Sequence, residues 1–390
     1  MAPSDKVYWK LSGFYFFYFA SVGALFPYWG LFLQSNGYSS SQIANVFAVI
    51  MGTKIIAPYI WGWLADRTGK RMQIIRIASL FSIVSFAGIF YSTDYLWLML
   101  CMVGFSFFWN ANLPQFEAVT FSHLGENAHR YSSIRLWGSL GFVLLVALLG
   151  SLIEQYDVGV LPGVILGLLV FIWFFSFIAP EKPVTSNKVR HGGIWGILSK
   201  PAVILFFIIC LLLQVSHGPY YAFFSIYLQD NGYSRTLIGQ LWALGVLAEV
   251  AVFLMMHRML PRWGASRLLV VALLLTAIRW VLIGHYVEST FIIFLAQLLH
   301  AASFGVYHAA AIHLVYVFFP RSMQGRGQAL YSSLSFGVGG AVGAYYSGLT
   351  WDSLGAALTY DIAAGLAIIG LLMSAWFVGA YKKARIQSDW

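Results

Sequence analysis

Long uninterrupted runs of apolar residues alternate along this chain with short polar segments. A hydrocarbon core about 30 Å thick requires roughly 20 apolar residues per helix, and the runs reach that length. Membrane β-strands would show alternating segments of about ten residues, whereas runs such as LLVALLG and LWLMLCMVGFSFFW do not alternate. We therefore predict an all-α membrane protein with twelve transmembrane helices, at residues 10–33, 41–62, 72–91, 95–121, 131–153, 158–179, 200–228, 235–259, 268–287, 290–319, 328–350 and 355–380.

The composition supports a membrane location and argues against a nucleic-acid partner. Of the 390 residues, 60% are hydrophobic and 9% are charged, whereas soluble domains are nearer half apolar and a quarter charged. The net charge of +9 would suit nucleic acid, but its distribution along the chain indicates another cause. The first apolar run is too long for a signal peptide, so we expect it to be the first span.

The basic residues gather on one side of the membrane if the predicted spans alternate in direction. On the other side Arg235 is the only basic residue, and it is accompanied there by acidic residues. By the positive-inside rule the basic side is cytoplasmic, so both termini are predicted to be cytoplasmic. The basic side carries Lys6, Lys10, Arg67, Lys70, Arg71, Arg76, Arg130, Lys182, Lys188, Arg190, Lys200, Arg258, Arg262, Arg267, Arg321, Arg326, Lys382, Lys383 and Arg385.

An internal repeat divides the sequence into two halves. The segment LQSNGYS at 33–39 recurs as LQDNGYS at 228–234, and Gly69 corresponds to Gly264 at the same offset of 195. Such internal similarity is typical of transporters built from repeated bundles. We predict a six-helix bundle at 1–180, a cytoplasmic linker at 181–199 and a second six-helix bundle at 200–390.

The loop GWLADRTGKR, residues 62–71, has a specific resemblance. Its residues Gly62, Asp66, Arg67, Gly69 and Arg71 resemble the signature loop between the second and third helices of the major facilitator superfamily. Together with the two six-helix halves, this identifies the chain as a member of that superfamily. The resemblance implies that these five residues form a cytoplasmic gating loop.

Two charged residues inside predicted spans form a candidate substrate site. A charge at bilayer depth costs about 3 kcal/mol on insertion scales, so each is a functional hypothesis. Glu117 and Arg135 lie at similar depth on the two arms of a helical hairpin and can pair. Their contexts PQFEAVT and IRLWGSLGF resemble the sugar-binding segment of the lactose permease family, which implies that both contact substrate and that Phe142 stacks on it. A purely structural ion pair between the two helices is the alternative.

Further polar residues inside the spans extend this candidate site. Glu249 and Lys54 differ by the repeat offset of 195, and the resemblance places Glu249 in the same cavity as Arg135. Lys54 is either a cavity cation or the partner of a carboxylate such as Asp361. His217 precedes Gly-Pro in the seventh span, and such interruptions of a helix point to transporter binding sites.

The second half carries candidates for proton coupling. The segment AIRWVLIG places Arg279 where the lactose permease family keeps a coupling arginine, and QLLHAAS aligns His300 with a histidine of its proton network. Ser303, however, stands where that family has its coupling carboxylate. The candidates to carry the proton are therefore Glu249 or Glu117, or else His300, because histidine is the side chain whose ordinary pKa lies near physiological pH.

The functional prediction is a secondary transporter that works by alternating access. The run LLHAASFGVYHAAAIH resembles the phenylpropionate permease family, which implies symport of a small aromatic carboxylate with a proton. The alternatives are a proton-coupled sugar or nucleoside permease and a membrane receptor that does not transport. No enzyme motif, metal site or cofactor is predicted. The predicted location is a bacterial inner membrane, as a monomer.

Overall fold

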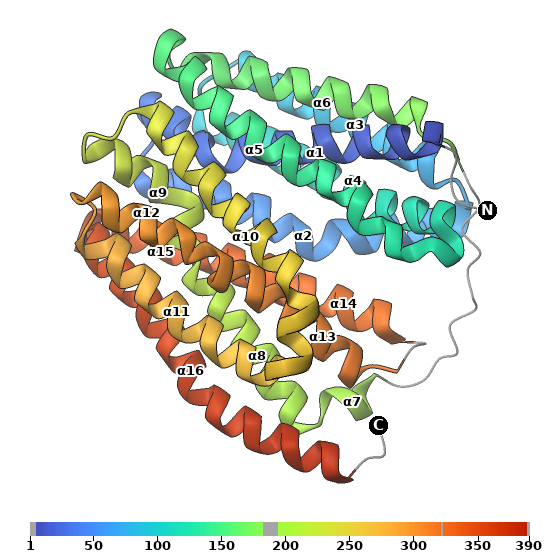
Figure 1. Cartoon of the computed structure of the whole chain (residues 1–390). Coiled ribbons are helices and arrows are strands. Elements are labelled where there is room, and N and C mark those ends of the chain that lie inside the picture. Colours follow the sequence, from blue (N-terminus) through green and yellow to red (C-terminus); the bar gives the residue numbers. More distant parts are fainter. Residues whose placement is uncertain (1–4, 182–193, 321–322, 388–390) are drawn as a thin grey trace. The chain divides into compact units, whose positions relative to one another are not determined.

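The computed structural model describes residues 5–181, 194–320 and 323–387, which are mainly helical. Figure 1 labels the α-helices in chain order. Their bounds are α1 Asp5–Ser35, α2 Ser40–Thr68, α3 Arg71–Ala87, α4 Tyr95–Leu124, α5 Tyr131–Tyr156, α6 Leu161–Ile178, α7 Trp195–Leu198, α8 Pro201–Ser216, α9 Gly218–Asp230, α10 Arg235–Trp263, α11 Ala265–His285, α12 Thr290–Leu298, α13 Tyr307–Phe318, α14 Gln324–Ser332, α15 Gly340–Leu354 and α16 Ala356–Gln387. Shorter segments are the 3-10 helices η1 Gly88–Phe90, η2 Gly125–Arg130 and η3 Val158–Val160, and the π-helices η4 Ala301–Val306 and η6 Ser333–Gly339.

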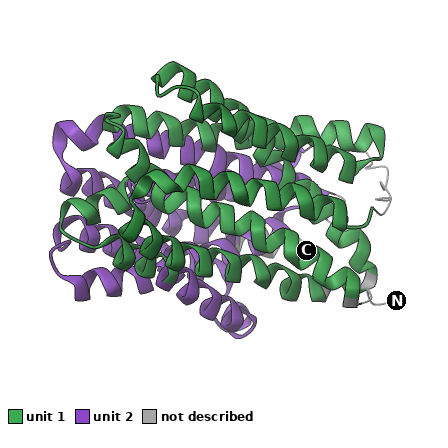
Figure 2. Cartoon of the chain, turned by 90° about the horizontal axis from the view of Figure 1, so that it is seen from above, with its two compact units in different colours: residues 1–187, 223–243 green, residues 188–222, 244–390 purple. Residues whose placement is uncertain are grey.

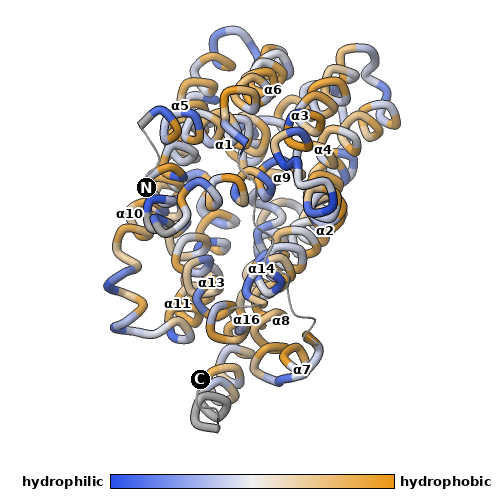
Figure 3. The backbone as a smooth tube through the Cα atoms, turned by 90° about the vertical axis from the view of Figure 1, so that its right-hand side faces the viewer, coloured by the Kyte–Doolittle hydropathy of each residue, from blue (hydrophilic) through white to orange (hydrophobic). Residues whose placement is uncertain are grey.

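The predicted all-α membrane fold is confirmed. Within the described residues, eleven helical segments are long and apolar enough to cross a membrane, and α6 illustrates the continuous hydrophobic colouring of such a segment (Figure 3). The region predicted as the span 328–350 is divided into α14, η6 and α15. The π-helical segment η6 interrupts the α-helical hydrogen bonding in the middle of this predicted span, so the span is divided into three elements.

The ends of the helices follow from local sequence. The Ser39 side chain caps α2 by accepting a hydrogen bond from the backbone N–H of Gln42, whose side chain caps Ser39 in return, a capping box. Gly37 and Gly232 both have positive φ angles, 81° and 83°, in the two copies of the repeated NGY segment. Glycine adopts this conformation without a steric penalty, so the repeat predicted from sequence has the same backbone turn in both halves.

The chain forms two compact units, which Figure 2 shows in different colours. The first comprises residues 1–187 and 223–243, and the second comprises 188–222 and 244–390. The segment 223–243 is thus part of the second repeat in sequence but belongs to the first unit. The predicted linker at 181–199 falls largely on 182–193, outside the described residues, and the predicted domain limits stay a prediction.

In the first unit α1 packs against α5 and α6, while α3 packs against α4 and α6 and α2 packs against α4. In the second unit α16 packs against α8 and α11, and α11 packs against α13 and η4. The core of the second unit includes Phe206, Leu269, Leu273, Tyr307 and Phe377, all at most 1% exposed. Each unit therefore buries its own apolar helix faces.

A close backbone approach in the second unit leads to a stability prediction. A Cβ atom added at Gly218 would lie 2.1 Å from the carbonyl carbon and oxygen of Gly343, so backbone would have to move. We expect Gly218→Ala to destabilise the protein by about 2 to 3 kcal/mol through overpacking. In detergent, this should lower the melting temperature measured by tryptophan fluorescence by on the order of 5 °C.

The matched control is Gly163→Ala in α6, where an added Cβ meets no atom within 4 Å. Alanine has the higher helix propensity, so this variant should melt at or slightly above the temperature of the unaltered protein. Equal melting temperatures for the two variants would contradict the packing argument.

Candidate functional site

Glu117 on α4 is held by a tyrosine and not by the arginine that the sequence suggested. The Tyr131 hydroxyl donates a hydrogen bond of 2.8 Å to Glu117 Oε1. Among the described ion pairs none joins Glu117 to Arg135, so the expected pair is not formed here. Tyr131 lies one turn before Arg135 on α5 and hydrogen-bonds the carboxylate, while the Arg135 guanidinium lies on Phe19.

Arg135 instead lies on an aromatic ring of α1. Its guanidinium carbon is 3.5 Å from the ring centroid of Phe19, within the range of a cation–π interaction. Phe142, the residue predicted to stack on substrate, is 8% exposed and packs against the backbone position of Gly23. Phe19 is half-buried, so in this unit it is the more accessible ring beside the arginine.

Lys54 on α2 has a similar arrangement. Its Nζ lies 5.5 Å from the centroid of Phe26, seven residues after Phe19 on α1 and hence on nearly the same helix face. Asp361, considered as a partner of Lys54, contacts His285 instead, with 2.8 Å between Oδ1 and Nε2. Among the described residues no carboxylate lies within ion-pair distance of Lys54.

The predicted gating loop comprises the end of α2, the turn after it and the first residue of α3. Gly69 ends α2 in the left-handed conformation with φ 69°, which lets the chain turn sharply into α3. Arg71 forms an ion pair with Asp66 and also donates a hydrogen bond to the side-chain oxygen of Gln115 on α4. Arg67 lies over the ring of Trp63.

The remaining residue of this loop, Gly62, faces α4. A Cβ added there would lie 3.5 Å from Gln115 Nε2, an ordinary contact distance. The loop is therefore tied to α4 through Gln115, a residue that the sequence motif did not include.

Arg279 on α11 is fully buried and is surrounded by neutral acceptors. Its Nε donates to the carbonyl oxygen of Ala296 at 3.0 Å, its Nη1 to Ser303 Oγ at 2.9 Å and its Nη2 to Gln297 Oε1 at 3.3 Å. The ring of Tyr220 covers it at 4.2 Å. Ser303, at the position where the resemblance leads us to expect a coupling carboxylate, is therefore a neutral hydrogen-bond acceptor for Arg279.

Glu249 on α10 and His300 approach each other in the second unit. Glu249 Oε2 lies 3.6 Å from His300 Nε2, and both side chains are largely buried. Two glycines leave room for the pair, because a Cβ at Gly305 would lie 3.2 Å from Glu249 Cγ and one at Gly245 would lie 3.4 Å from His300 Cβ. The π-helix η4 begins directly after His300 and contains Ser303, and π-helical turns occur frequently at functional sites.

His217, the other predicted binding residue, lies between α8 and α9 and is fully buried. Its Nδ1 is 2.8 Å from the carbonyl oxygen of Leu213, so Nδ1 carries the hydrogen that it donates. Its Nε2 has no hydrogen-bond partner among the described residues. The ring meets Trp280 edge to face, with centroids 4.9 Å apart.

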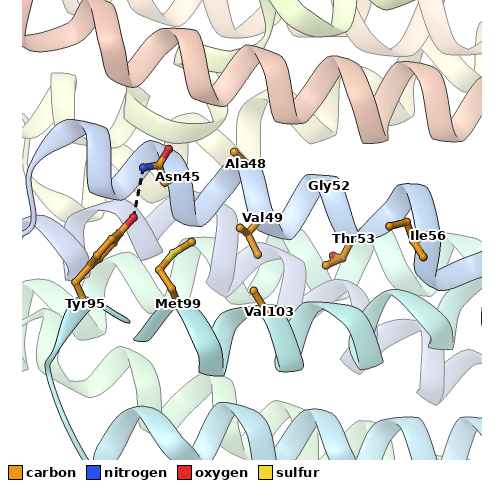
Figure 4. Close-up of a pocket in the computed structure, with 9 residues that line it drawn as sticks. All are labelled: Asn45, Ala48, Val49, Gly52, Thr53, Ile56, Tyr95, Met99 and Val103. Atoms are coloured by element: carbon orange, nitrogen blue, oxygen red, sulfur yellow. Dashed lines mark hydrogen bonds between the residues drawn. The ribbon is translucent and has the colours of Figure 1, made fainter. Parts of the chain in front are cut away.

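A groove of about 490 Å³ runs between α2 and α4 in the first unit (Figure 4). One end is polar, where Asn45 Nδ2 donates to the Tyr95 hydroxyl at 3.4 Å. None of the residues that line it is charged. Its lining consists of Asn45, Ala48, Val49, Gly52, Thr53, Ile56, Tyr95, Met99 and Val103.

The comparisons with known proteins agree with this architecture. The family described as MFS_1 like matches residues 8–362. The "Probable 3-phenylpropionic acid transporter" of Escherichia coli strain K12 is 29% identical over 87% of this chain and 90% of its own. The "Maltose permease" of Geobacillus stearothermophilus is 25% identical over 84% and 83% of the two chains. A solved variant of the nucleoside transporter NupG superimposes with a TM-score of 0.85 at 14% identity, covering 96% of this chain and 100% of its own.

The fold, the repeat and these relatives define the class: the protein is a multi-pass membrane transporter of the major facilitator fold. The relatives and structural neighbours are transporters and not enzymes. The chain belongs to the MFS_1-like family.

Proposed function

We propose that the protein is a symporter that carries a small aromatic carboxylate together with a proton, by alternating access. One observation supports this most: Lys54 and Arg135, two cations inside spans of the first unit, have no carboxylate within ion-pair distance among the described residues, and Glu117 accepts a hydrogen bond from Tyr131 instead. A carboxylate substrate would supply the missing negative charge. The E. coli relative named for 3-phenylpropionic acid supports the same class of substrate.

Arg135 is proposed to bind the substrate carboxylate, because a guanidinium presents a planar fork of donors to the two oxygens. We propose that Phe19, which contacts this guanidinium, meets the substrate ring beside it. Glu117 and Lys54 are the other proposed binding residues of the first unit, and His217 is the proposed binding residue of the second unit, considered by itself. Phe142 is buried and packs against α1 at Gly23. We therefore propose that it supports the binding site by packing and does not stack on the substrate.

The proposed proton site is the Glu249–His300 pair of the second unit. A carboxylate and an imidazole 3.6 Å apart can share one proton and release it when their surroundings change. Arg279, whose described hydrogen-bond partners are all neutral acceptors, is the other residue of the second unit that we propose to take part in coupling. Glu117 remains the alternative acid in the first unit.

A neutral sugar or nucleoside is the second candidate substrate. The maltose permease relative and the NupG fold support it, and Glu117 and Arg135 offer an acceptor and a donor for hydroxyl groups. In either case we propose a monomer in a bacterial inner membrane with both termini in the cytoplasm.

Equilibrium binding separates the two candidates. In detergent, isothermal titration with 3-phenylpropionate, its neutral amide, maltose and uridine should show binding of the acid at least about tenfold tighter than the amide, a difference of ~1.4 kcal/mol. Equal affinity for acid and amide would contradict the carboxylate assignment. Binding of maltose or uridine alone would establish the second candidate.

A further inference from the structure

Arg235 is an exception in the charge pattern of the chain. It is the only basic residue assigned to the predicted outer side, where the accompanying charges are acidic residues such as Asp157 and Glu154. The positive-inside rule disfavours a basic residue near a span end on that side. A specific contact would explain why an arginine is present there.

The structure shows four contacts at this residue. Arg235 Nη1 donates to Asp157 Oδ1 at 2.7 Å and to the carbonyl oxygen of Ile153 at 3.3 Å, and Nε donates to Gln229 Oε1 at 3.0 Å. The backbone N–H of Arg235, at the start of α10, donates to Glu154 Oε2. The three contacts with Ile153, Glu154 and Asp157 join the end of α5, in the first repeat, to the beginning of α10, in the second repeat.

Asp157 is held in an unusual conformation for this contact. Its φ of 74° makes it the only residue other than glycine with a positive φ in the described part of the chain. Such a conformation persists only where the surroundings impose it. The backbone amide of Val158 and the Arg235 side chain keep the pKa of Asp157 below its ordinary value, so the carboxylate is charged at neutral pH.

Tight packing lies directly next to these polar contacts. A Cβ at Gly239 would lie 2.3 Å from the Tyr28 hydroxyl and 2.5 Å from the carbonyl oxygen of Val146, and one at Gly150 would lie 2.6 Å from the carbonyl oxygen of Arg235. Tyr28 in turn donates to the Val146 carbonyl at 2.6 Å. Helices α1, α5 and α10 therefore meet without space for a solute along this stretch.

We propose that Arg235, with Asp157 and Glu154, is a releasable clasp that holds the outer ends of the two repeats together and must open before substrate can enter from outside. The clasp lies partly in solvent, since the Asp157 side chain is 70% exposed. An exposed ion pair contributes little to stability, which suits a contact that breaks in every transport cycle.

Thiol labelling tests the clasp without knowledge of the substrate. Val146, fully buried beside the contact, is replaced by Cys in a Cys101→Ser background and exposed to a membrane-impermeant maleimide in right-side-out vesicles. We expect Asp157→Asn and Arg235→Gln each to raise the labelling rate at position 146 about threefold, because loss of the exposed ion pair shifts the balance between closed and open states by ~0.7 kcal/mol. The exchanged pair Asp157→Arg with Arg235→Asp should bring the rate back towards that of the parent.

Cys210, fully buried in the second unit, is the internal control for folding, and mass spectrometry separates the two labelled sites. Rate increases at position 146 with Cys210 unlabelled would support the clasp, and so would the recovery in the exchanged pair. Unchanged labelling in both single variants would overturn the proposal, as would an exchanged pair no slower than the singles. If Asp157→Asn or Arg235→Gln also exposes Cys210, the Arg235→Lys variant is used instead. It retains the positive charge, so the proposal requires position 146 in this variant to be labelled as slowly as in the parent.

Discussion

Replacing Arg135 with Gln is expected to lower kcat/KM for uptake of 3-phenylpropionate by about 100-fold or more. The guanidinium lies on Phe19 without a carboxylate partner among the described residues, so it is available to the substrate. Losing a charged hydrogen-bond partner in a buried site costs roughly 2 to 5 kcal/mol, and each 1.4 kcal/mol is a factor of ten. Arg135→Lys should recover only part of the rate, since an ammonium lacks the planar fork.

Arg76→Gln is the matched control for this experiment. Arg76 also lies over an aromatic ring, 5.1 Å from the centroid of Phe177, and donates to the carbonyl oxygen of Ser176. It is in the same unit but contacts α6 and none of the proposed binding residues. Comparable losses in the two variants would show that the effect of Arg135 is structural, and the anchoring role would then be abandoned.

Replacing Glu249 with Gln is expected to abolish accumulation driven by a proton gradient while leaving substrate exchange in place. An amide cannot release a proton, so the carrier remains in its proton-loaded form. In that form the substrate-loaded carrier can change between its inward-facing and outward-facing states, but the empty carrier cannot return. Counterflow of radiolabelled 3-phenylpropionate, measured beside gradient-driven uptake in the same proteoliposomes, separates the two activities.

Asp361→Asn provides the control, because Asp361 and His285 form a second carboxylate–histidine pair in the same unit. That pair is far more exposed than Glu249 and His300, with side chains 37% and 44% exposed. Gradient-driven uptake should survive this substitution. Loss of accumulation in the Asp361 variant and not in the Glu249 variant would place the coupling acid elsewhere.

The sequence predicted the fold well because its signals are local. Apolar runs of about 20 residues define a span without reference to any partner, and the capping box at Ser39 and Gln42 marks the beginning of α2. The paired turn glycines, Gly37 and Gly232, kept their unusual conformation in both repeats. The division of the span 328–350 was not predicted, since hydrophobic periodicity does not distinguish a π-helical turn from an α-helical one.

The side-chain contacts within the candidate site were harder to predict, because differences of a few ångströms between neighbouring helices decide which side chains meet. Glu117 and Arg135 lie on adjacent helices at similar depth, yet Tyr131 bonds to the carboxylate and Phe19 covers the guanidinium. Burial of Phe142 follows from the small size of Gly23 on a neighbouring helix, which the chain order does not reveal. Spacing offered one usable signal: Tyr131 precedes Arg135 by four residues and so shares its helix face.

The most direct test of the transport assignment is uptake of radiolabelled 3-phenylpropionate into proteoliposomes with an imposed inward proton gradient and with none. We expect accumulation above the external concentration that requires the gradient and disappears when a protonophore is added. Uptake that stays at the level of empty liposomes under both conditions would contradict the assignment of an aromatic carboxylate carried with a proton.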